Sequence, residues 1–335
     1  MSKRNQNSKI FSPCSVARSF VPSLIFGIVM CSPFFAAHAE KPATPEKVRL
    51  ALNWKPEPQF GGFYAAQIAQ LDKQHGVEFE IQPGGAGTPV VQMVAAGQID
   101  FGIASGDEIL VSRVRGSDVV ALYAVYQTNP QGILTRADRG FESLGDVFKS
   151  SGTIAMQKGL PYALFLQRKY ANGMKAAIVP YLGGISNFLS NKNHSQQCFV
   201  TSEPLLAQKR GTKVKTFLVA ESGFNPYTTV LVTRASILKD KPELVKNVVS
   251  AVRAGWKLYL ESPDEAHAKM NELNPSIDLA SMKEMWEAQK ALIESKENVT
   301  LGSMRSERWA DLLEQLYSMK VISKKIEVAP IFVNL

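Results

Sequence analysis

The sequence predicts an α/β protein built as two lobes that are joined by two crossings of the chain. Apolar segments of strand length alternate with helical segments from Val48 to Thr233. A polar interruption after Tyr126 predicts a crossing out of the first lobe, and a strand from Thr228 predicts the return. From Pro242 onward the pattern is mainly helical. Two crossings form a hinge, which is typical of a protein that closes on a ligand.

The first 39 residues are predicted to be a cleaved signal peptide. Four basic residues precede an apolar run over 20–35, and an A-x-A cleavage motif follows at 37–39. A membrane anchor is the alternative, but an anchor needs about 20 apolar residues. The run is shorter than that and contains Pro22 and Pro33. We therefore expect cleavage after Ala39 and export to the periplasm.

Composition excludes several classes of site. The chain has 335 residues, 45% of them apolar, which is enough for a sizeable core. Removing the four basic residues of the signal peptide lowers the net charge from +8 to +4, and the remaining charges are interspersed, so no nucleic-acid partner is expected. Cys198 is the only cysteine after residue 39, which excludes an intramolecular disulfide and a cysteine-based zinc site. We expect no metal and no cofactor.

The stretch VRLALNWKPEPQFGGFY opens the first lobe. A strand over 48–52 leads through a polar and aromatic loop into a helix over 63–74, and a strand over 77–82 completes a β-α-β unit. In open α/β sheets, ligands bind outside the carboxyl ends of the strands. Trp54 and Tyr64 are therefore candidate walls of a pocket, and Gly61-Gly62 would let the backbone approach a ligand. The alternative is that both aromatic side chains are core residues and the glycines form only a turn.

A Gly-rich turn over 83–89 joins the second strand to a helix over 90–97. Thr88 is expected to cap this helix. The turn's backbone N–H groups, at Gly84 and Gly85 among others, are candidates for holding a polar or anionic ligand group. Such turns are also ordinary α/β connections, and this one has neither GxGxxG nor GK[ST] spacing, so nucleotide binding is not predicted.

Polar residues follow later strands in the same way. A buried strand over 101–104 ends at Ser105 and Asp107, ahead of a helix over 109–114. Asp107 is either a ligand contact or the cap of that helix. Strands are also expected over 119–126 and 133–136.

The second lobe is expected over 136–228, so that 45–135 and 229–335 form the first. A helix within 141–148, a strand over 153–156, a helix over 161–172 and a strand over 176–181 follow in order. The polar segment NKNHSQQ then precedes a short strand over 198–200. Gln157 and Glu203 lie at strand-to-helix turns, as Trp54 and Asp107 do in the first lobe.

The remaining segments complete both lobes without catalytic motifs. Strands are expected over 214–219 and 228–233, and Trp256, Trp286 and Trp309 lie at helical core spacing, which indicates packing. The histidines share no metal-ligand spacing, and neither HExxH nor GxSxG occurs. We therefore expect a binding protein and not an enzyme.

Several segments resemble the NMT1/THI5-like group of periplasmic solute-binding proteins. They are a Gly-rich turn and the stretches NWKPEPQFGGFYAAQ, MVAAGQIDFGIASGDEIL, VTSEPLLAQKRG and VLVTRASILKDKPELVKNVVSA. The resemblance implies a two-lobed periplasmic-binding-protein fold of type II, with a hinge and an interlobe ligand cleft. It also implies a receptor that delivers a small-molecule ligand to the permease of an ABC transporter. We expect a monomer.

The resemblance places the ligand at loop positions that line the cleft. These positions are Trp54, Tyr64, Gly84, Gly85, Thr88, Ser105, Asp107, Gln157 and Glu203. Relatives with a similar opening motif bind thiamine pyrimidine precursors, and others in the wider group bind sulfonates, nitrate or riboflavin. A carboxylate at Glu203 favours an amino-bearing or cationic ligand, so we expect a heterocycle similar to a thiamine precursor. A sulfonate- or nitrate-type anion is the alternative.

The family also includes pyrimidine-synthesising enzymes with a CCCFC motif and a catalytic histidine. This chain has Gln-Gln-Cys-Phe-Val at 196–200, in the comparable region. One cysteine cannot replace that motif, and an exported enzyme of this kind is not expected. The histidine of the pyrimidine-binding opening motif is also missing, since Gln59 or Phe60 stands near its place.

Overall fold

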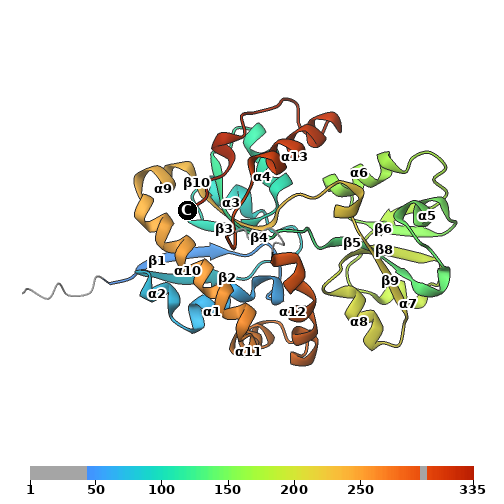
Figure 1. Ribbon diagram of the computed structural model, residues 1–335, viewed down its shortest axis with the longest axis horizontal. Helices are drawn as coiled ribbons and strands as arrows, with labels where there is room; N and C mark the ends of the chain where they lie inside the picture. Colours follow the sequence, from blue (N-terminus) through green and yellow to red (C-terminus); the bar gives the residue numbers. More distant parts are fainter. Residues whose placement is uncertain (1–43, 295–299) are drawn as a thin grey trace, which may run out of the picture. The chain divides into compact units, whose positions relative to one another are not determined.

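Two five-stranded mixed sheets form the framework of the chain (Figure 1). The structure is a computed structural model, and it describes residues 44–294 and 300–335, within one compact unit from Ala43 to Leu335. The strand order is β2-β1-β3-β10-β4 in the first sheet and β7-β6-β8-β5-β9 in the second. We call the parts built on these sheets the first lobe and the second lobe. The predicted signal peptide and its cleavage site lie outside the described residues.

The first sheet is parallel on one side and antiparallel on the other. Its strands are β1 (Glu46–Ala51), β2 (Val77–Gln82), β3 (Phe101–Ala104), β4 (Val119–Tyr126) and β10 (Thr228–Arg234). β1 pairs in parallel with β2 and β3, and β10 runs antiparallel to β3 and β4. The strands expected over 77–82, 101–104 and 119–126 are confirmed with the same bounds, as is the β-α-β unit.

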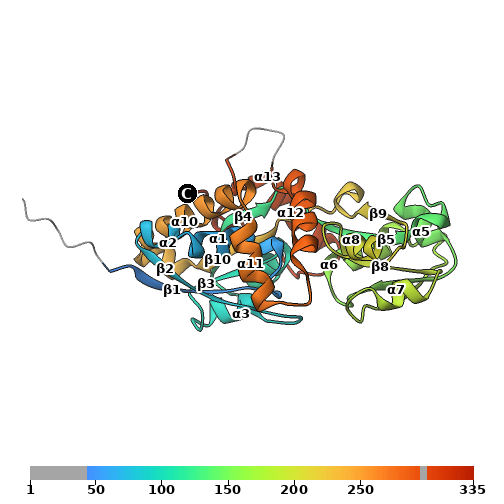
Figure 2. The ribbon, with the colours of Figure 1, turned by 90° about the horizontal axis from the view of Figure 1, so that it is seen from below.

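Helices cover both faces of the first sheet (Figures 1 and 2). One set is α1 (Gly61–Ile68), α2 (Leu71–Gln74), α10 (Pro242–Glu261), α11 (Asp264–Leu273) and α12 (Leu279–Ile293). The other set is α3 (Val90–Ala95), α4 (Gly106–Val114) and α13 (Ser306–Ser318), and α9 (Ala235–Asp240) follows β10. Along β3, Phe101 and Ile103 belong to one buried cluster and Ala104 to the other, because successive side chains point to opposite faces.

The first helix differs from the prediction. A single helix over 63–74 was expected, but Gln70 adopts φ +54°, and α1 and α2 are separate helices. Gly61 and Gly62 form the first residues of α1. A Cβ atom at Gly61 would lie 2.0 Å from the Tyr259 ring, and one at Gly62 would lie 2.3 Å from the Trp256 ring. The glycines therefore let α1 pack closely against α10. This corrects both readings of them, the approach to a ligand and the simple turn.

The predicted packing role of the tryptophans is confirmed for two of them. Trp256 and Trp309 are fully buried, on α10 and α13. Trp286 is only partly buried on α12, where its indole N–H donates to the Tyr259 carbonyl at 2.9 Å.

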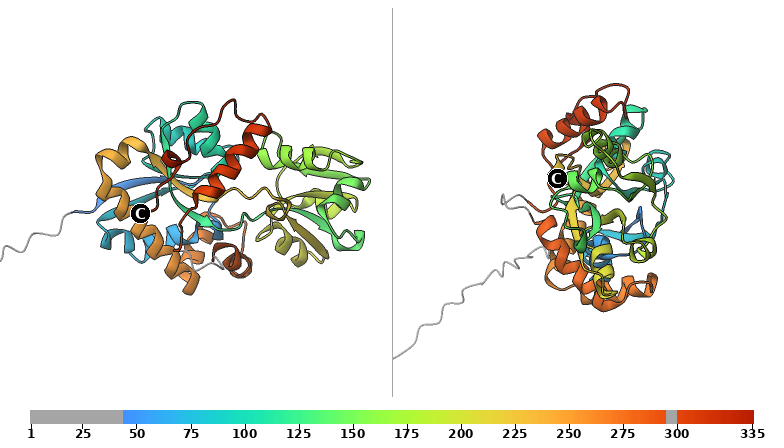
Figure 3. Two further views of the ribbon diagram at one scale, coloured as in Figure 1. Left: turned by 45° about the horizontal axis from the view of Figure 1, so that its top comes forward. Right: turned by 90° about the vertical axis from the view of Figure 1, so that its right-hand side faces the viewer.

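The second sheet forms the centre of the second lobe (Figure 3, green to yellow). Its strands are β5 (Gln131–Arg136), β6 (Thr153–Met156), β7 (Ala177–Pro180), β8 (His194–Phe199) and β9 (Val214–Leu218). Its helices are α5 (Leu144–Lys149), α6 (Pro161–Lys169), α7 (Ser186–Ser190) and α8 (Glu203–Lys209). The central strand β8 runs parallel to β6 and antiparallel to β5.

β8 begins earlier than the sequence pattern predicts. Residues up to 197 were expected to be a polar connection, but the strand already begins at His194. Its buried polar side chains are hydrogen-bonded: His194 Nδ1 lies 2.8 Å from Thr153 Oγ1, and Gln196 Nε2 donates to the Gly184 carbonyl at 2.9 Å. Hydrogen-bonded polar residues can occupy a buried strand, and hydropathy does not show this.

The first crossing of the chain lies at the polar interruption predicted after Tyr126. β5 pairs with β8 and β9, so the first crossing lies between Tyr126 and Gln131, ahead of the predicted lobe boundary after residue 135. The second crossing lies between β9 and β10, and it contains the 3₁₀ turn η3 (Ala220–Ser222). The predicted extent of each lobe otherwise stays a prediction.

Arg308 of α13 joins the two crossings. Its guanidinium donates to the carbonyl of Gln127 in the first crossing and to that of Asn225 in the second, both at 2.6 Å. Asn129 Nδ2 donates to the Pro226 carbonyl at 3.0 Å. Burial lowers the pKa of Arg308 to about 10, and its charge lies over the Tyr227 ring at 3.8 Å.

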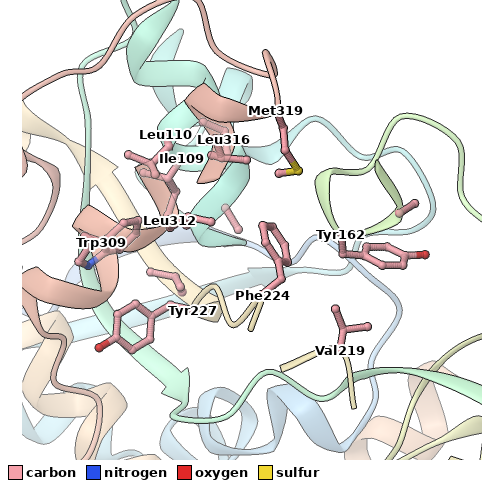
Figure 4. Close-up of a cluster of buried hydrophobic side chains, with 14 of the residues drawn as sticks. Ile109, Leu110, Tyr162, Val219, Phe224, Tyr227, Trp309, Leu312, Leu316 and Met319 are labelled. Carbon is pink, nitrogen blue, oxygen red and sulfur yellow. The ribbon is translucent and has the colours of Figure 1, made fainter. Parts of the chain in front are cut away.

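A buried apolar cluster lies beside these crossings (Figure 4). Tyr227 of the second crossing packs against Trp309, with ring centroids 5.7 Å apart. Phe224 stacks on Phe165 of α6, with centroids 5.2 Å apart. The second crossing is therefore packed against helices of both lobes.

We predict that Gly62→Ala destabilises the protein by about 1 to 3 kcal/mol, because the added methyl group would overlap the Trp256 ring. Urea unfolding followed by circular dichroism measures the change. Gly85→Ala is the matched control, since nothing lies within 4 Å of a Cβ atom there, and its effect should be small. Equal stabilities of the two variants would contradict the packing argument.

Candidate ligand-binding site

The loop after β1 holds the first group of predicted site residues. Trp54 is partly buried, and its indole N–H donates to Glu57 Oε1 at 3.2 Å. The Trp54 carbonyl accepts from the Gly84 amide at 3.1 Å, which joins this loop to the Gly-rich turn. A Cβ atom at Gly84 would lie 2.0 Å from the Leu52 carbonyl oxygen, so only glycine allows the two loops to approach this closely.

Two side chains from the last third of the chain hold this loop in place by hydrogen bonds. Asn274, which follows α11, donates from Nδ2 to the Pro56 carbonyl at 3.0 Å. Gln289 of α12 donates from Nε2 to the Pro58 carbonyl at 3.1 Å, and its Oε1 accepts from the Tyr126 hydroxyl at 2.7 Å. Both side chains are buried. The loop therefore depends on helices more than two hundred residues away in the sequence.

Thr88 does not cap the following helix. Its hydroxyl bonds back within the turn, accepting from the Gly85 amide at 2.9 Å and donating to the Gly85 carbonyl at 3.0 Å. α3 begins at Val90 with no side-chain cap. The Gly-rich turn is closed on itself by this threonine, which corrects the predicted capping role.

Ser105 and Asp107 lie at the start of α4. Ser105 is the N-cap residue, and both its amide and its hydroxyl donate to Glu108 Oε2 at 3.0 Å. The capping role considered for Asp107 is therefore taken by Ser105 and Glu108. Asp107 is 8% exposed, and burial raises its pKa to about 6.

The second lobe places Glu203 at the first position of α8. Its Oε1 accepts from the Tyr181 hydroxyl at 3.1 Å, and its Oε2 accepts from the Phe199 amide at 2.8 Å. Burial raises the pKa of Glu203 and of the neighbouring Cys198 thiol. Two donors thus orient a desolvated carboxylate at the carboxyl ends of β7 and β8.

Gln157 contributes its backbone to the same end of the second sheet. Its amide donates to Gln197 Oε1 at 2.5 Å, and the Tyr162 hydroxyl donates to the same oxygen. The Gln157 side chain is exposed.

Residues of both lobes line a small hollow that has room for about one water molecule. They are Glu57, Pro58, Gln59, Met285 and Gln289 from the first lobe and Phe199, Thr201 and Ser202 from the second. Glu203 follows Ser202 directly. Burial, and then the charge of Glu203, raise the pKa of Glu57 to about 7. The loop of Trp54 and the start of α8 therefore meet at one place.

The predicted site residues divide into three groups. Trp54 and Glu203 are adjacent to the hollow through Glu57 and Ser202. The residues Gly84, Gly85, Thr88, Ser105, Asp107 and Gln157 follow other strands of the two sheets and are not among the hollow's lining residues. Tyr64 is 1% exposed and packs in the apolar cluster under α10, so we leave it out of the proposed site.

Several residues at or beside the hollow were not singled out from the sequence. Glu57 was within reach of sequence reasoning, because it lies three residues after Trp54 in the same loop. Tyr181 directly follows a strand, which is the same signal that identified Gln157. Met285 and Gln289 lie within the helical pattern of α12, and nothing in the neighbouring sequence distinguishes them from packing residues.

A second contact joins the lobes beside the hollow. Lys209 at the end of α8 donates to Ser281 Oγ of α12 at 2.8 Å and lies 3.3 Å from Glu284. Partly exposed ion pairs of this kind contribute only about 0 to 1 kcal/mol. This contact places the end of α8 against α12. It adds little to the free energy of unfolding.

Within residues 44–294 and 300–335, no cluster of side chains has a composition suited to a metal ion. No helix in these ranges is long and apolar enough to span a membrane.

Residues 57–266 match the NMT1/THI5-like family, which is more than half of the chain. The chain belongs to this family. The match includes Glu57 and Glu203, but it ends before Gln289.

Proteins similar to this chain have different named functions. The chain is 22% identical to the riboflavin-binding protein RibY of Chloroflexus aurantiacus, over 93% of this chain and 96% of that protein. It is similar to the periplasmic aliphatic sulphonate-binding protein SsuA of Escherichia coli, with a TM-score of 0.67 and 14% identity over 86% of this chain and 92% of that one. The desulfurization enzyme DSZB has a TM-score of 0.60 and 12% identity, over 86% and 96% of the two chains.

The structural likeness confirms the predicted fold class. The two mixed sheets with their helices form a periplasmic-binding-protein fold of type II, as in SsuA. Identities this low show the fold alone and do not identify the ligand.

We predict that Glu57→Gln stabilises the ligand-free protein above pH 7. Between pH 4.5 and about 7, the folded protein holds a proton on Glu57 that the unfolded chain releases, so the unfolding free energy falls as the pH rises through this window. The variant should therefore be more stable by about 1 to 3 kcal/mol at about pH 8, and by little at about pH 4.5. Gln keeps an acceptor for the Trp54 indole.

Urea unfolding at both pH values measures this difference. Glu221→Gln, the same change at an exposed site, is the control and should show no pH-dependent gain. A constant offset of Glu57→Gln at all pH values would contradict the raised pKa.

Proposed function

We propose that this protein is the periplasmic solute-binding component of an ABC importer, which captures a small nutrient when its two lobes close. The observation that carries the proposal is the hollow lined by both lobes, where the Trp54 loop meets the start of α8. A ligand held there touches both sheets at the carboxyl ends of their strands, where ligands of α/β proteins bind. Family membership supports the same role. Export, a monomeric state and delivery to a permease belong to this proposal.

We propose a flat, amino-bearing heterocycle as the ligand, similar to a thiamine pyrimidine precursor. Trp54 supplies an aromatic surface for stacking, and Phe199 and Tyr181 stand on the other lobe. Glu203 supplies an acceptor for an amino or protonated ring nitrogen, because a desolvated carboxylate requires a donor. The riboflavin named for RibY is also a flat heterocycle, so it belongs in the test.

A sulfonate-type anion is the second candidate, favoured by the fold shared with SsuA. The site opposes it, since an anion beside Glu57 and Glu203 would add a third negative charge to a desolvated place. Catalysis is less supported than binding, although DSZB has the same fold. The region of the enzymes' cysteine-rich motif is occupied here by Gln196, Gln197 and a single buried cysteine.

A thermal-shift screen of the mature protein tests this function. We expect amino-pyrimidines, and not alkanesulfonates or nitrate, to raise the melting temperature, because a ligand that binds only the folded state stabilises it by mass action. Riboflavin and spermidine complete the set of compounds. A shift with the anions alone would overturn the proposed ligand class, and no shift with any compound would overturn the binding function.

We predict that Trp54→Ala weakens binding of the best ligand by about 1 to 3 kcal/mol, through the loss of aromatic stacking. Isothermal titration calorimetry measures the dissociation constant. Tyr317→Ala is the control, because Tyr317 is an exposed aromatic residue on α13 that does not line the hollow. An unchanged dissociation constant for Trp54→Ala would remove this residue from the site.

A further inference from the structure

We propose that Glu57 and Glu203 act together as a pair that selects a positively charged nitrogen on the ligand, one carboxylate from each lobe. The inference rests on the proposed function, since it names the charge of the ligand that the same site takes. Glu57 was not among the predicted binding residues. We call these two residues the carboxylate pair.

Glu57 is held in place from several sides. It caps the 3₁₀ turn η1 (Pro58–Phe60) with an extended backbone, and the Trp54 indole donates to its Oε1 at 3.2 Å. Gln289 fixes the next residue through the Pro58 carbonyl at 3.1 Å. The Glu57 carboxylate therefore lies at the hollow on a constrained loop, which limits its motion.

Glu203 is fixed in the same way on the other lobe. Each of its carboxylate oxygens receives one donor, from the Tyr181 hydroxyl at 3.1 Å and from the Phe199 amide at 2.8 Å. A carboxylate accepts about four hydrogen bonds. Each oxygen thus has capacity for a further donor, and the same holds for Glu57 with its bond from Trp54.

No ion pair of the described residues includes either member of the carboxylate pair. The ion pairs on the first lobe and between the lobes use other acids, such as Asp100 with Arg49 and Glu284 with Lys209. Lys55, exposed and two residues before Glu57, acts on it only at longer range and lowers its pKa by the smallest of the contributions. Two desolvated carboxylates without a counter-ion repel each other, and a bound cation offsets this cost.

A proton is the alternative partner of the pair. The charges of the pair raise the pKa values of the surrounding tyrosines and of one thiol, and burial also keeps these groups neutral. They are Tyr126, Tyr162, Tyr181 and Cys198. The pKa of Glu57, about 7, means that a proton occupies the pair below neutral pH. A cationic ligand must displace this proton, so its affinity should fall as the pH decreases below about 7.

A matched pair of compounds tests the inference. 4-Amino-5-aminomethyl-2-methylpyrimidine carries an ammonium group where its 5-hydroxymethyl counterpart carries a neutral hydroxyl. At about pH 8, we expect the wild-type protein to bind the aminomethyl compound at least about tenfold more tightly than the hydroxymethyl compound. Glu57→Gln and Glu203→Gln should each abolish most of this preference. Glu327→Gln, the same change at an exposed site outside the two crossings, should keep it. Calorimetry at about pH 5 should show the wild-type preference reduced.

The outcomes separate the inference from the proposed function. Equal affinity for the two compounds, or a preference that survives Glu57→Gln, would overturn the carboxylate pair while leaving a binding protein. Binding of riboflavin or sulfonates but of neither pyrimidine would do the same. If none of these compounds binds, the proposed function fails and the inference fails with it. Circular dichroism and urea unfolding show whether each variant is folded.

Discussion

The two crossings of the chain are held together by one partly buried cation, and the relation between the lobes depends on it. Arg308 donates to carbonyl groups of both crossings, and Asn129 adds a bond between them. Backbone groups at a crossing cannot complete a sheet ladder, and leaving them unpaired in a buried place costs about 1 to 3 kcal/mol each. Because α13 supplies the arginine, this C-terminal helix is part of the hinge.

This arrangement restricts where motion can occur. The apolar cluster around Phe224 and Tyr227 packs the second crossing against both lobes. Closely packed interiors shift between discrete arrangements and do not deform continuously. Opening and closing would therefore be carried by small backbone rotations at the ends of the crossings, while the contact of Lys209 with α12 forms or breaks at little cost.

The sequence predicted the fold well where hydropathy and structure agree. β2, β3, β4 and β6 have the expected bounds, because each is a short apolar run or a strict alternation bounded by turn residues. It failed at β8, where buried polar side chains find partners that come from elsewhere in the chain. It also misread Gly61 and Gly62, because the need for glycine comes from the rings of Tyr259 and Trp256. Partners of that kind are set by tertiary structure and leave no local pattern.

The candidate site shows the same division. Trp54 and Glu203 could be predicted from the rule that ligands bind at strand ends. Gln289 could not, because its role depends on hydrogen bonds with Pro58 and Tyr126, which are distant in the sequence. The conformation of the loop after β1 therefore depends on Asn274 and Gln289, which come from a distant part of the sequence. In evolutionary terms, the shape of the pocket can drift through substitutions in α11 and α12 while the recognisable loop motif stays unchanged. Grafting residues 52–60 onto a related scaffold would therefore transfer the motif without its geometry, unless the region around 274–289 were transplanted with it.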